Sequence, residues 1–388
     1  MISLVNRNNI YFGKKYPNKP DRPDVNVGVI ENFSVKDTDI NGDGCPDYPH
    51  GKVVKNILTF NLRFKPTIVE FDTSCELTGN GFSKENTYRA FKKFADTKNI
   101  DYAVISFGED NKYNEKDYNY NTKSELAEKL LKDFIPETSD NIKVINTLKE
   151  IVSKNKHLFV AGGNKTNKDL LDDSEIKHVN LFSLVPGIIS VGSMDDNFKK
   201  LKKSYDNPFI DLFAKGKYDV MPILENGTVI GYDITEDGIM DVPISEITGH
   251  EVIEKFVGRD IKDVLATDDE AQLLIKLIDS SIIKDGLITE KDLSPELKIL
   301  NSKLFDIGTP ESPESRYTDL LSLLNDINGV TDIAPNLKFR IENGKVVYNP
   351  HKEGEPAKTL SGTSFAAPVA MAQVLNEKYG YVAPEAVK

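Results

Sequence analysis

Ser364 is the residue of this sequence whose surroundings best suit covalent chemistry. It lies in the segment LSGTSFAAP (360–368), where a small polar turn leads into a run of small and apolar residues. This pattern predicts a loop followed by a buried helix, with Ser364 at the helix N-terminus and Pro368 in its first turn. Unpaired N–H groups and the helix dipole would stabilise an anion that forms beside Ser364. The alternative is an ordinary surface turn, because Gly-Thr-Ser alone is common in turns.

The string GTSFAAP resembles the serine motif of subtilisin-like serine peptidases. The resemblance implies that Ser364 is the nucleophile and that an acid and a histidine precede it, with an oxyanion-binding amide between histidine and serine. His50 opens the segment HGKVV, which is similar to the family's histidine motif at the start of a helix. Asn164 ends the segment FVAGGN, where two glycines after an apolar strand let the amide approach a substrate. A structural histidine and an ordinary strand-ending turn are the alternatives for these two residues.

The acid is expected at Glu31, directly after the apolar stretch 25–30. The family usually has an aspartate followed by a small residue and glycine, whereas this chain has glutamate followed by Asn-Phe. Glutamate carries the same charge on a side chain that is one methylene longer, and some triad hydrolases use it, so Glu31 is predicted to orient His50. Two alternatives remain open, namely a disabled site or the use of Asp37 or Asp39 as the acid.

Two strand ends are expected to contact the substrate. Ser106, Phe107 and Gly108 end an apolar stretch and resemble the family's segment that lines the specificity pocket and pairs with the substrate backbone. Gly162 and Gly163 end another apolar run and are expected to let the backbone approach the substrate. The hydrophilic stretch that follows, 109–123, is expected to be a long loop near the pocket.

Composition limits the possible partners. The chain has 388 residues, with 61 acidic and 49 basic residues and a net charge of −12, which argues against generic nucleic-acid binding. No apolar run is long enough to cross a bilayer, so no membrane partner is expected. The start lacks the apolar core of a secretory signal, which predicts a cytoplasmic protein if the chain is complete and a secreted one if it is a mature or trimmed form. Whether the only two cysteines, Cys45 and Cys75, pair is left open.

Apolar runs alternate with amphipathic stretches along 25–216. The runs are expected as strands and the stretches as helices, with strands at 25–30, 67–71, 102–107, 157–161, 187–191 and 210–214 and helices at 84–96 and 145–154. Strands that are apolar on both faces predict an α/β class, a mostly parallel sheet with helices on both faces, as in the three-layer subtilisin-like fold. Ligands bind beyond the carboxyl ends of such strands, which is where Glu31, Ser106 and Asn164 fall.

The predicted domains follow from the extent of the resemblance. They are an N-terminal arm over 1–24, a peptidase domain over 25–216 and 345–388, and an insertion over 217–344. The insertion is inferred because the stretch between Asn164 and Ser364 is much longer than the family's core needs. Within it, 284–293 resembles the second half of an EF-hand loop, but Ile283 occupies an early ligand position and cannot coordinate a metal. We therefore expect a partly helical, EF-hand-like module to which another protein could bind.

Two acidic loops share the pattern D-x-[N/T]-x-D-G-x-x-D, at 39–47 and 233–241. Oxygen side chains at alternate positions, followed by glycine, allow a tight turn to direct several ligands at one hard cation. We therefore expect shortened loops that bind structural Ca²⁺, and the alternative is a pair of acidic glycine turns. The expected ligands are Asp39, Asn41, Asp43 and Asp47 in the first loop and Asp233, Thr235, Asp237 and Asp241 in the second.

Two functions compete at this stage. The first is a serine endopeptidase that cleaves polypeptides through an acyl-enzyme, with a Glu31/His50/Ser364 triad and an oxyanion hole formed by Asn164 and the Ser364 N–H. The second is a catalytically impaired, subtilisin-like scaffold that binds a protein partner. The departures from the family pattern at and after Glu31 favour the scaffold, whereas the retained serine, histidine and asparagine motifs favour the enzyme.

Overall fold

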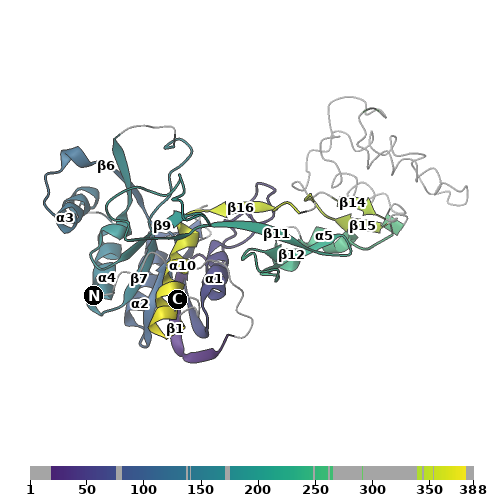
Figure 1. Cartoon of the computed structure of the whole chain (residues 1–388), viewed down its shortest axis with the longest axis horizontal. Helices are drawn as coiled ribbons and strands as arrows, with labels where there is room; N and C mark the ends of the chain where they lie inside the picture. The colour runs from purple at the N-terminus through teal and green to yellow at the C-terminus, as the bar shows by residue number, and fades with distance from the viewer. Residues whose placement is uncertain are drawn as a thin grey trace, which may run out of the picture.

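A six-stranded parallel sheet forms the centre of the main body of the molecule (Figure 1). The computed structural model describes residues 19–75, 81–136, 139, 141–170, 175–247, 250–260, 263–264, 291, 339–342, 345–352 and 354–381. The strand order is β10-β9-β7-β5-β1-β2, and every neighbouring pair is parallel. The six strands are β1 (Asp21–Glu31), β2 (Lys65–Asp72), β5 (Ile100–Ile105), β7 (His157–Ala161), β9 (Ile189–Met194) and β10 (Leu212–Lys215).

Helices cover both faces of this sheet. The helices α1 (His50–Asn61) and α10 (Thr363–Lys378) pack on one face, and α2 (Lys84–Asp96), α3 (Lys123–Phe134) and α4 (Asn141–Ser153) lie on the other. Because side chains alternate along a strand, each central strand contributes to both cores. In β5, Val104 joins the α1/α10 core while Ala103 and Ile105 join the opposite core. The predicted α/β class, with a parallel sheet between two helical layers, is confirmed, and so are the predicted strands and helices within small shifts at their ends.

The helix α10 differs in one respect from the sequence expectation. It begins at Thr363, so Pro368 lies beyond the first turn and inside the helix. Its missing N–H leaves the carbonyl of Ser364 without the usual donor four residues later. Buried alanines on either side of Pro368, Ala366 and Ala370 among them, let the helix pack closely on the sheet.

Short elements surround the carboxyl edge of the sheet. The stretch 109–123, which the sequence predicts as a loop, contains a strand and a 3-10 helix, because β6 pairs in antiparallel fashion with β8. These elements are β3 (Ser74–Cys75), β4 (Gly81–Phe82), β6 (Asp110–Asn114), η2 (Glu115–Asp117), β8 (Ile176–Asn180) and η3 (Leu181–Leu184). Cys45 and Cys75 are not joined in a disulfide.

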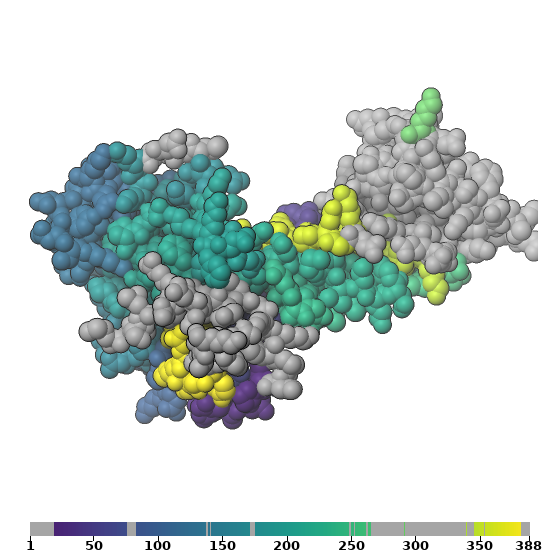
Figure 2. Space-filling view, viewed as in Figure 1, coloured from purple at the N-terminus to yellow at the C-terminus, as the bar shows by residue number. Residues whose placement is uncertain are grey.

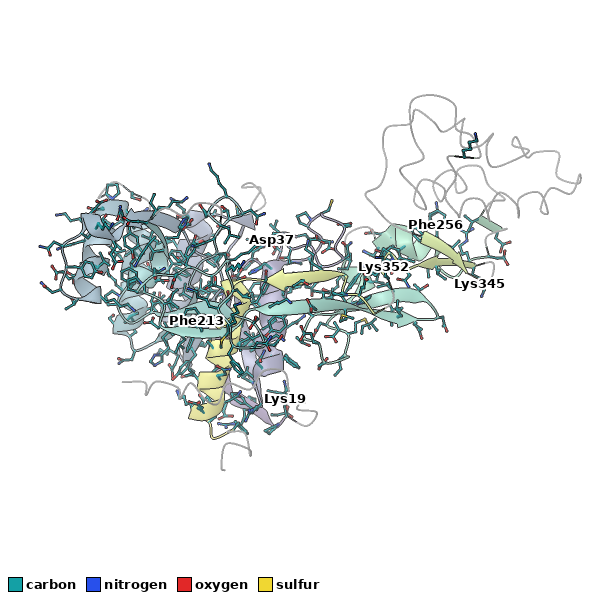
Figure 3. All side chains as sticks on the ribbon, turned by 45° about the horizontal axis from the view of Figure 1, so that its top comes forward. Lys19, Asp37, Phe213, Phe256, Lys345 and Lys352 are labelled. Atoms are coloured by element: carbon teal, nitrogen blue, oxygen red, sulfur yellow. The ribbon has the colours of Figure 1, made fainter. Side chains whose placement is uncertain are left out.

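A projecting lobe, which we define as the described residues of 217–361, extends away from this body (Figures 1 and 2). Its sheet has the order β13-β12-β11-β16, so the chain leaves the body along β11 and returns along β16. Figure 3 labels Asp37 on the body side of its base and Phe256 and Lys345 toward its far end. The elements of the lobe are β11 (Lys217–Glu225), β12 (Thr228–Asp233), β13 (Val242–Pro243), η4 (Ile244–Glu246), α5 (His250–Phe256), β14 (Phe339–Glu342), β15 (Lys345–Tyr348) and β16 (Lys358–Ser361).

The predicted domain boundaries stay predictions. The strand β1 begins at Asp21, inside the predicted N-terminal arm, and β15 begins at 345 and pairs with β14 within the lobe. The EF-hand-like segment 284–293 lies outside the described residues apart from Lys291. Of the helices in the described part of the chain, none is both long and apolar enough to span a bilayer.

Candidate active site

Glu31 and His50 are in contact at the carboxyl edge of the sheet. Glu31 is the last residue of β1 and is completely buried. Its Oε2 lies 3.2 Å from Nδ1 of His50, the first residue of α1, and also accepts the N–H of Asn32 at 3.1 Å. Its Oε1 accepts the N–H of Ser106 at 3.0 Å. A buried carboxylate with these donors is held in one orientation, so it fixes the imidazole and leaves Nε2 of His50 for proton transfer.

Asp37, one of the alternative acids, supports His50 in another way. Its Oδ1 accepts the backbone N–H of His50 at 2.8 Å, and its Oδ2 accepts the side-chain amide of Asn32 at 2.7 Å. Asp37 therefore satisfies a free donor at the start of α1, where Pro49 at the N-cap position makes no side-chain bond. Asn32 in turn accepts the N–H of Gly51 through its carbonyl at 2.8 Å. The unusual residue after Glu31 thus belongs to the support of His50.

The charges around His50 favour its protonated form. Burial by itself lowers the pKa of His50, but the charge and hydrogen bond of Glu31, with a contribution from Asp37, raise that pKa above the ordinary value of 6.5. A raised pKa makes the imidazole a stronger base toward a hydroxyl group. The same charges stabilise the imidazolium that proton transfer creates.

Asn164 is bound to the first turn of α10. Its Oδ1 accepts the N–H of Thr363 at 2.9 Å, and the N–H of Gly163 donates to Oγ1 of Thr363 at 3.0 Å. With Oδ1 engaged, Nδ2 remains the group that Asn164 can offer to an anion. Gly163 has a φ of 105° and lies against the ring of Tyr205, where a Cβ atom would overlap with that ring. Glycine is therefore required at this position to bring Asn164 to the helix.

Ser364 lies between residues that contact His50 and Asn164. The preceding Thr363 is bound to Asn164, and the following Phe365 packs on the imidazole of His50 with 5.4 Å between ring centroids. Ser364 is in the first turn of α10 and is partly exposed. Within the described part of the chain, Ser364 forms no hydrogen bond with His50. Such bonds are often loose without substrate and tighten in the complex, so the arrangement is compatible with a nucleophile and its base.

The predicted substrate-contact residues lie beside this site. Ser106, Phe107 and Gly108 follow β5, which lies between the strands that end at Glu31 and precede Asn164. The backbone of Ser106 supports Glu31, and its buried Oγ has no hydrogen-bond partner among the described residues. The substrate role of these residues, and that of Gly162 and Gly163, stays a prediction.

Asn180 is a residue of this region that the sequence analysis missed. Its Nδ2 donates to the carbonyl of Ala161 at 2.6 Å and, more weakly, to that of Phe107 at 3.5 Å. It thereby joins the ends of β5 and β7, and a Cβ atom on Gly108 would overlap with its amide. The available signal is slight, because Asn180 ends a short strand of mixed polarity and belongs to no motif.

The two acidic loops fold into the same turn. In each, the aspartate at the first position accepts N–H groups from the fourth and sixth positions, and the aspartate at the ninth accepts them from the second and third. The sequence repeat is therefore a structural repeat. Across the described residues, no group of three or more His, Cys, Asp or Glu side chains is arranged to hold a metal ion. Calcium binding stays a prediction.

The last aspartate of each loop is electrostatically unfavourable when it is charged. Burial raises the pKa of Asp47 to about 7 and that of Asp241 to about 6, even though N–H donors act in the opposite direction. Neighbouring aspartates, such as Asp39 beside Asp47 and Asp233 beside Asp241, raise these pKa values further. A bound cation would offset this repulsion.

Comparison with known proteins gives only distant similarity. The sequence matches no protein-family model and no curated protein. Among solved structures, it is similar to a lanthipeptide protease (12% identity over 92% of this chain and 75% of the other, TM-score 0.37). It is also similar to the nisin leader peptidase NisP of Lactococcus lactis (14% identity over 95% of this chain and 81% of the other, TM-score 0.36). A third similar structure is the epidermin leader peptide processing serine protease EpiP of Staphylococcus aureus (12% identity over 95% of this chain and 68% of the other, TM-score 0.37). At these values we base the function on the geometry of the site alone.

Proposed function

We propose that this chain is a subtilisin-like serine endopeptidase with a Glu31/His50/Ser364 triad. The observation that carries the proposal is the convergence of four segments, distant in sequence, at one edge of the sheet. Glu31 contacts His50 directly, while Ser364 is joined to His50 and Asn164 through its two neighbours in the chain. An acid, a base, a nucleophile and an amide donor therefore meet where a peptide can approach α10.

The proposed reaction begins with proton transfer. As Oγ of Ser364 attacks the carbonyl carbon of a peptide bond, Nε2 of His50 takes the hydroxyl proton, and the carbonyl oxygen becomes an oxyanion. Nδ2 of Asn164 and the N–H of Ser364 bind this oxyanion at the positive end of α10. When the intermediate collapses, the C–N bond breaks and His50 gives its proton to the leaving amine. Water then attacks the acyl ester, loses a proton to His50, and Ser364 regains its own.

Glu31 acts on His50 throughout this cycle. Its charge stabilises the imidazolium in both half-reactions, and its fixed carboxylate keeps Nδ1 protonated and Nε2 directed away from β1. The bond from Ser106 anchors the far oxygen of the carboxylate, so the extra methylene of glutamate does not leave the group free to rotate. This anchoring supports a working acid over the scaffold alternative.

The test is labelling of the purified protein with a fluorophosphonate, which reacts with activated serine hydroxyls. We expect labelling of the wild type, its loss in Ser364→Ala, and strong reduction in His50→Ala. Ser361→Ala provides a matched control, because Ser361 is an exposed serine at the end of β16, close to Ser364 in the chain. Labelling that survives in Ser364→Ala, or no labelling of the folded wild type, would contradict the proposal and favour the scaffold.

A further inference from the structure

An ion pair joins the chain segment that carries His50 to the one that carries Ser364. Nζ of Lys358 lies 2.6 Å from Oδ2 of Asp39. Asp39 opens the acidic loop 39–47, which ends shortly before His50, and Lys358 opens β16, which leads into α10. Asp39 is 12% exposed and Lys358 41%, so the pair is partly shielded from water.

The loop 39–47 is rigidly connected to His50. Thr38 and Tyr48 pair across its base through two backbone hydrogen bonds of 3.0 Å. Asp37, next to this base, accepts the backbone N–H of His50. A displacement of Asp39 would therefore be transmitted to the start of α1.

The strand β16 is connected in the same way to Ser364. It pairs with β11 from Lys358 to Ser361, and the N–H of Gly362 donates to the carbonyl of Gly216 at 2.8 Å. Its neighbour Ala357 lies directly on the acidic loop, because a Cβ atom on Gly42 would overlap with the Ala357 carbonyl. A displacement of Lys358 would thus move the first turn of α10.

The second acidic loop, 233–241, contacts the strand pair β11/β16 from the side of β11. Lys215, which is almost completely buried at the end of β10, lies 2.8 Å from Oε2 of Glu236 in the loop 233–241. Oε1 of Glu236 accepts the N–H of Asp219 in β11 at 2.8 Å. The strands β11 and β16 are therefore held by an acidic loop on each side. Of the two sets of contacts, the ion pair between Lys358 and Asp39 is the one that leads to His50.

We propose that Lys358 is a positioning residue, whose ion pair with Asp39 sets the separation of His50 and Ser364. The inference rests on the proposed function. No hydrogen bond joins Ser364 to His50 within the described residues, and the packing of Phe365 on His50 is non-directional. The helices α1 and α10 pack on each other through apolar side chains. The charged pair adds a directional contact between the segments that lead into these helices.

The experiment compares three variants in labelling rate and in peptide hydrolysis. Lys358→Met keeps the aliphatic stem and removes the charge, Lys358→Arg keeps the charge, and Lys352→Met is the matched control. Lys352, labelled in Figure 3, lies in the same lobe, and its side chain forms an exposed ion pair with Glu355 at 3.8 Å. We expect Lys358→Met to lower the labelling rate and kcat by about tenfold or more with little change in KM, since small misplacements of reacting groups are costly. Lys358→Arg and Lys352→Met should stay within about twofold of the wild type, and 1 M NaCl should slow the wild type but not Lys358→Met.

A second measurement does not depend on activity. Hydrogen exchange of the Gly362 amide, which binds the Gly216 carbonyl, should become faster in Lys358→Met and not in Lys352→Met. Unchanged labelling and unchanged exchange in a folded Lys358→Met protein would overturn the inference while leaving the proposed function intact. If the wild type is not labelled, the proposed function fails instead. The exchange rates of the Gly362 amide in the wild type and in Lys358→Met then decide whether the ion pair fixes the start of α10.

Discussion

Nδ1 of His50 lies 3.2 Å from Oε2 of Glu31, while Oε1 of the same carboxylate accepts the N–H of Ser106 at 3.0 Å. One buried side chain thus joins the ends of two neighbouring strands to the start of α1. Both carboxylate oxygens of Glu31 are hydrogen-bonded, and the longer side chain of glutamate lets them contact His50 and Ser106 at the same time. A glutamate at position 31 is therefore structurally accommodated.

This relationship predicts the effect of two substitutions of Glu31. Glu31→Gln removes the charge and should lower kcat by roughly 10⁴-fold, the loss found when a triad acid is neutralised. Glu31→Asp keeps the charge but cannot reach both His50 and the Ser106 N–H, so kcat should fall by roughly 10- to 100-fold. Peptide hydrolysis measures both effects, with thermal unfolding as the control for folding. Higher activity in Glu31→Asp than in the wild type would contradict the accommodation of glutamate.

The second prediction concerns pH. The base must be neutral to accept a proton, and Glu31 raises the pKa of His50, so kcat/KM should rise with pH through a limb above 6.5. In Glu31→Gln the limb should move to lower pH, as measured on the residual activity. Because the folded-state pKa is raised, the pair stabilises the fold fully below the unfolded-state pKa, and this contribution is lost as pH rises through the raised value. A limb that does not move in Glu31→Gln would remove His50 as the group that titrates.

The sheet was predictable from the sequence because its strands are apolar on both faces. Runs such as 102–107 and 157–161 can only be buried between two layers, and their hydrophobic pattern marks both position and class. The ends of the strands were less certain, since β5 stops at Ile105 and the Ser106 backbone turns to support Glu31.

The candidate site residues were found through their motifs, whereas the residues that support them were not. Asp37 and Asn180 act through hydrogen bonds to groups far away in sequence, His50 being 13 positions from Asp37 and Ala161 being 19 from Asn180. No local periodicity encodes such contacts. The strand β6 was missed for the same reason. Its polar sequence is typical of a loop, and it is a strand because it pairs with β8.

The third prediction separates the two roles of Asn164. Asn164→Asp keeps an oxygen for the Thr363 N–H but cannot donate to an oxyanion, and Asn164→Ala loses both interactions. Both should lower kcat by roughly 10²- to 10³-fold with little change in KM, because the donor acts on the transition state. Only Asn164→Ala should also lower the melting temperature. Equal kcat in the wild type and Asn164→Asp would show that the amide does not bind the oxyanion.

The fourth prediction compares two glycines with left-handed backbone. Gly163→Ala adds both the strain of a positive φ and an overlap with the Tyr205 ring, whereas Gly380→Ala adds the strain alone, because nothing lies within 4 Å of its Cβ position. Gly380→Ala should cost about 1–2 kcal/mol of unfolding free energy, and Gly163→Ala clearly more. Gly163→Ala should also reduce labelling of Ser364, since it displaces Asn164 and Thr363. Denaturant unfolding measures the first difference, and equal losses in the two variants would contradict the packing of Gly163 on Tyr205.

The last prediction concerns calcium and the two acidic loops. Burial, and to a smaller extent neighbouring aspartates, raise the pKa values of Asp47 and Asp241, and a cation bound in each loop would offset both effects by stabilising the charged carboxylates. Millimolar Ca²⁺ should therefore raise the melting temperature relative to chelator, with about 2.7 kcal/mol of stabilisation at a hundredfold excess over the dissociation constant. Asp43→Asn and Asp237→Asn should each remove part of the shift, whereas Asp117→Asn, at an exposed site away from both loops, should keep it. Identical melting temperatures with calcium and with chelator would contradict calcium binding. Both loops would then be acidic glycine turns that are held by their own backbone N–H groups.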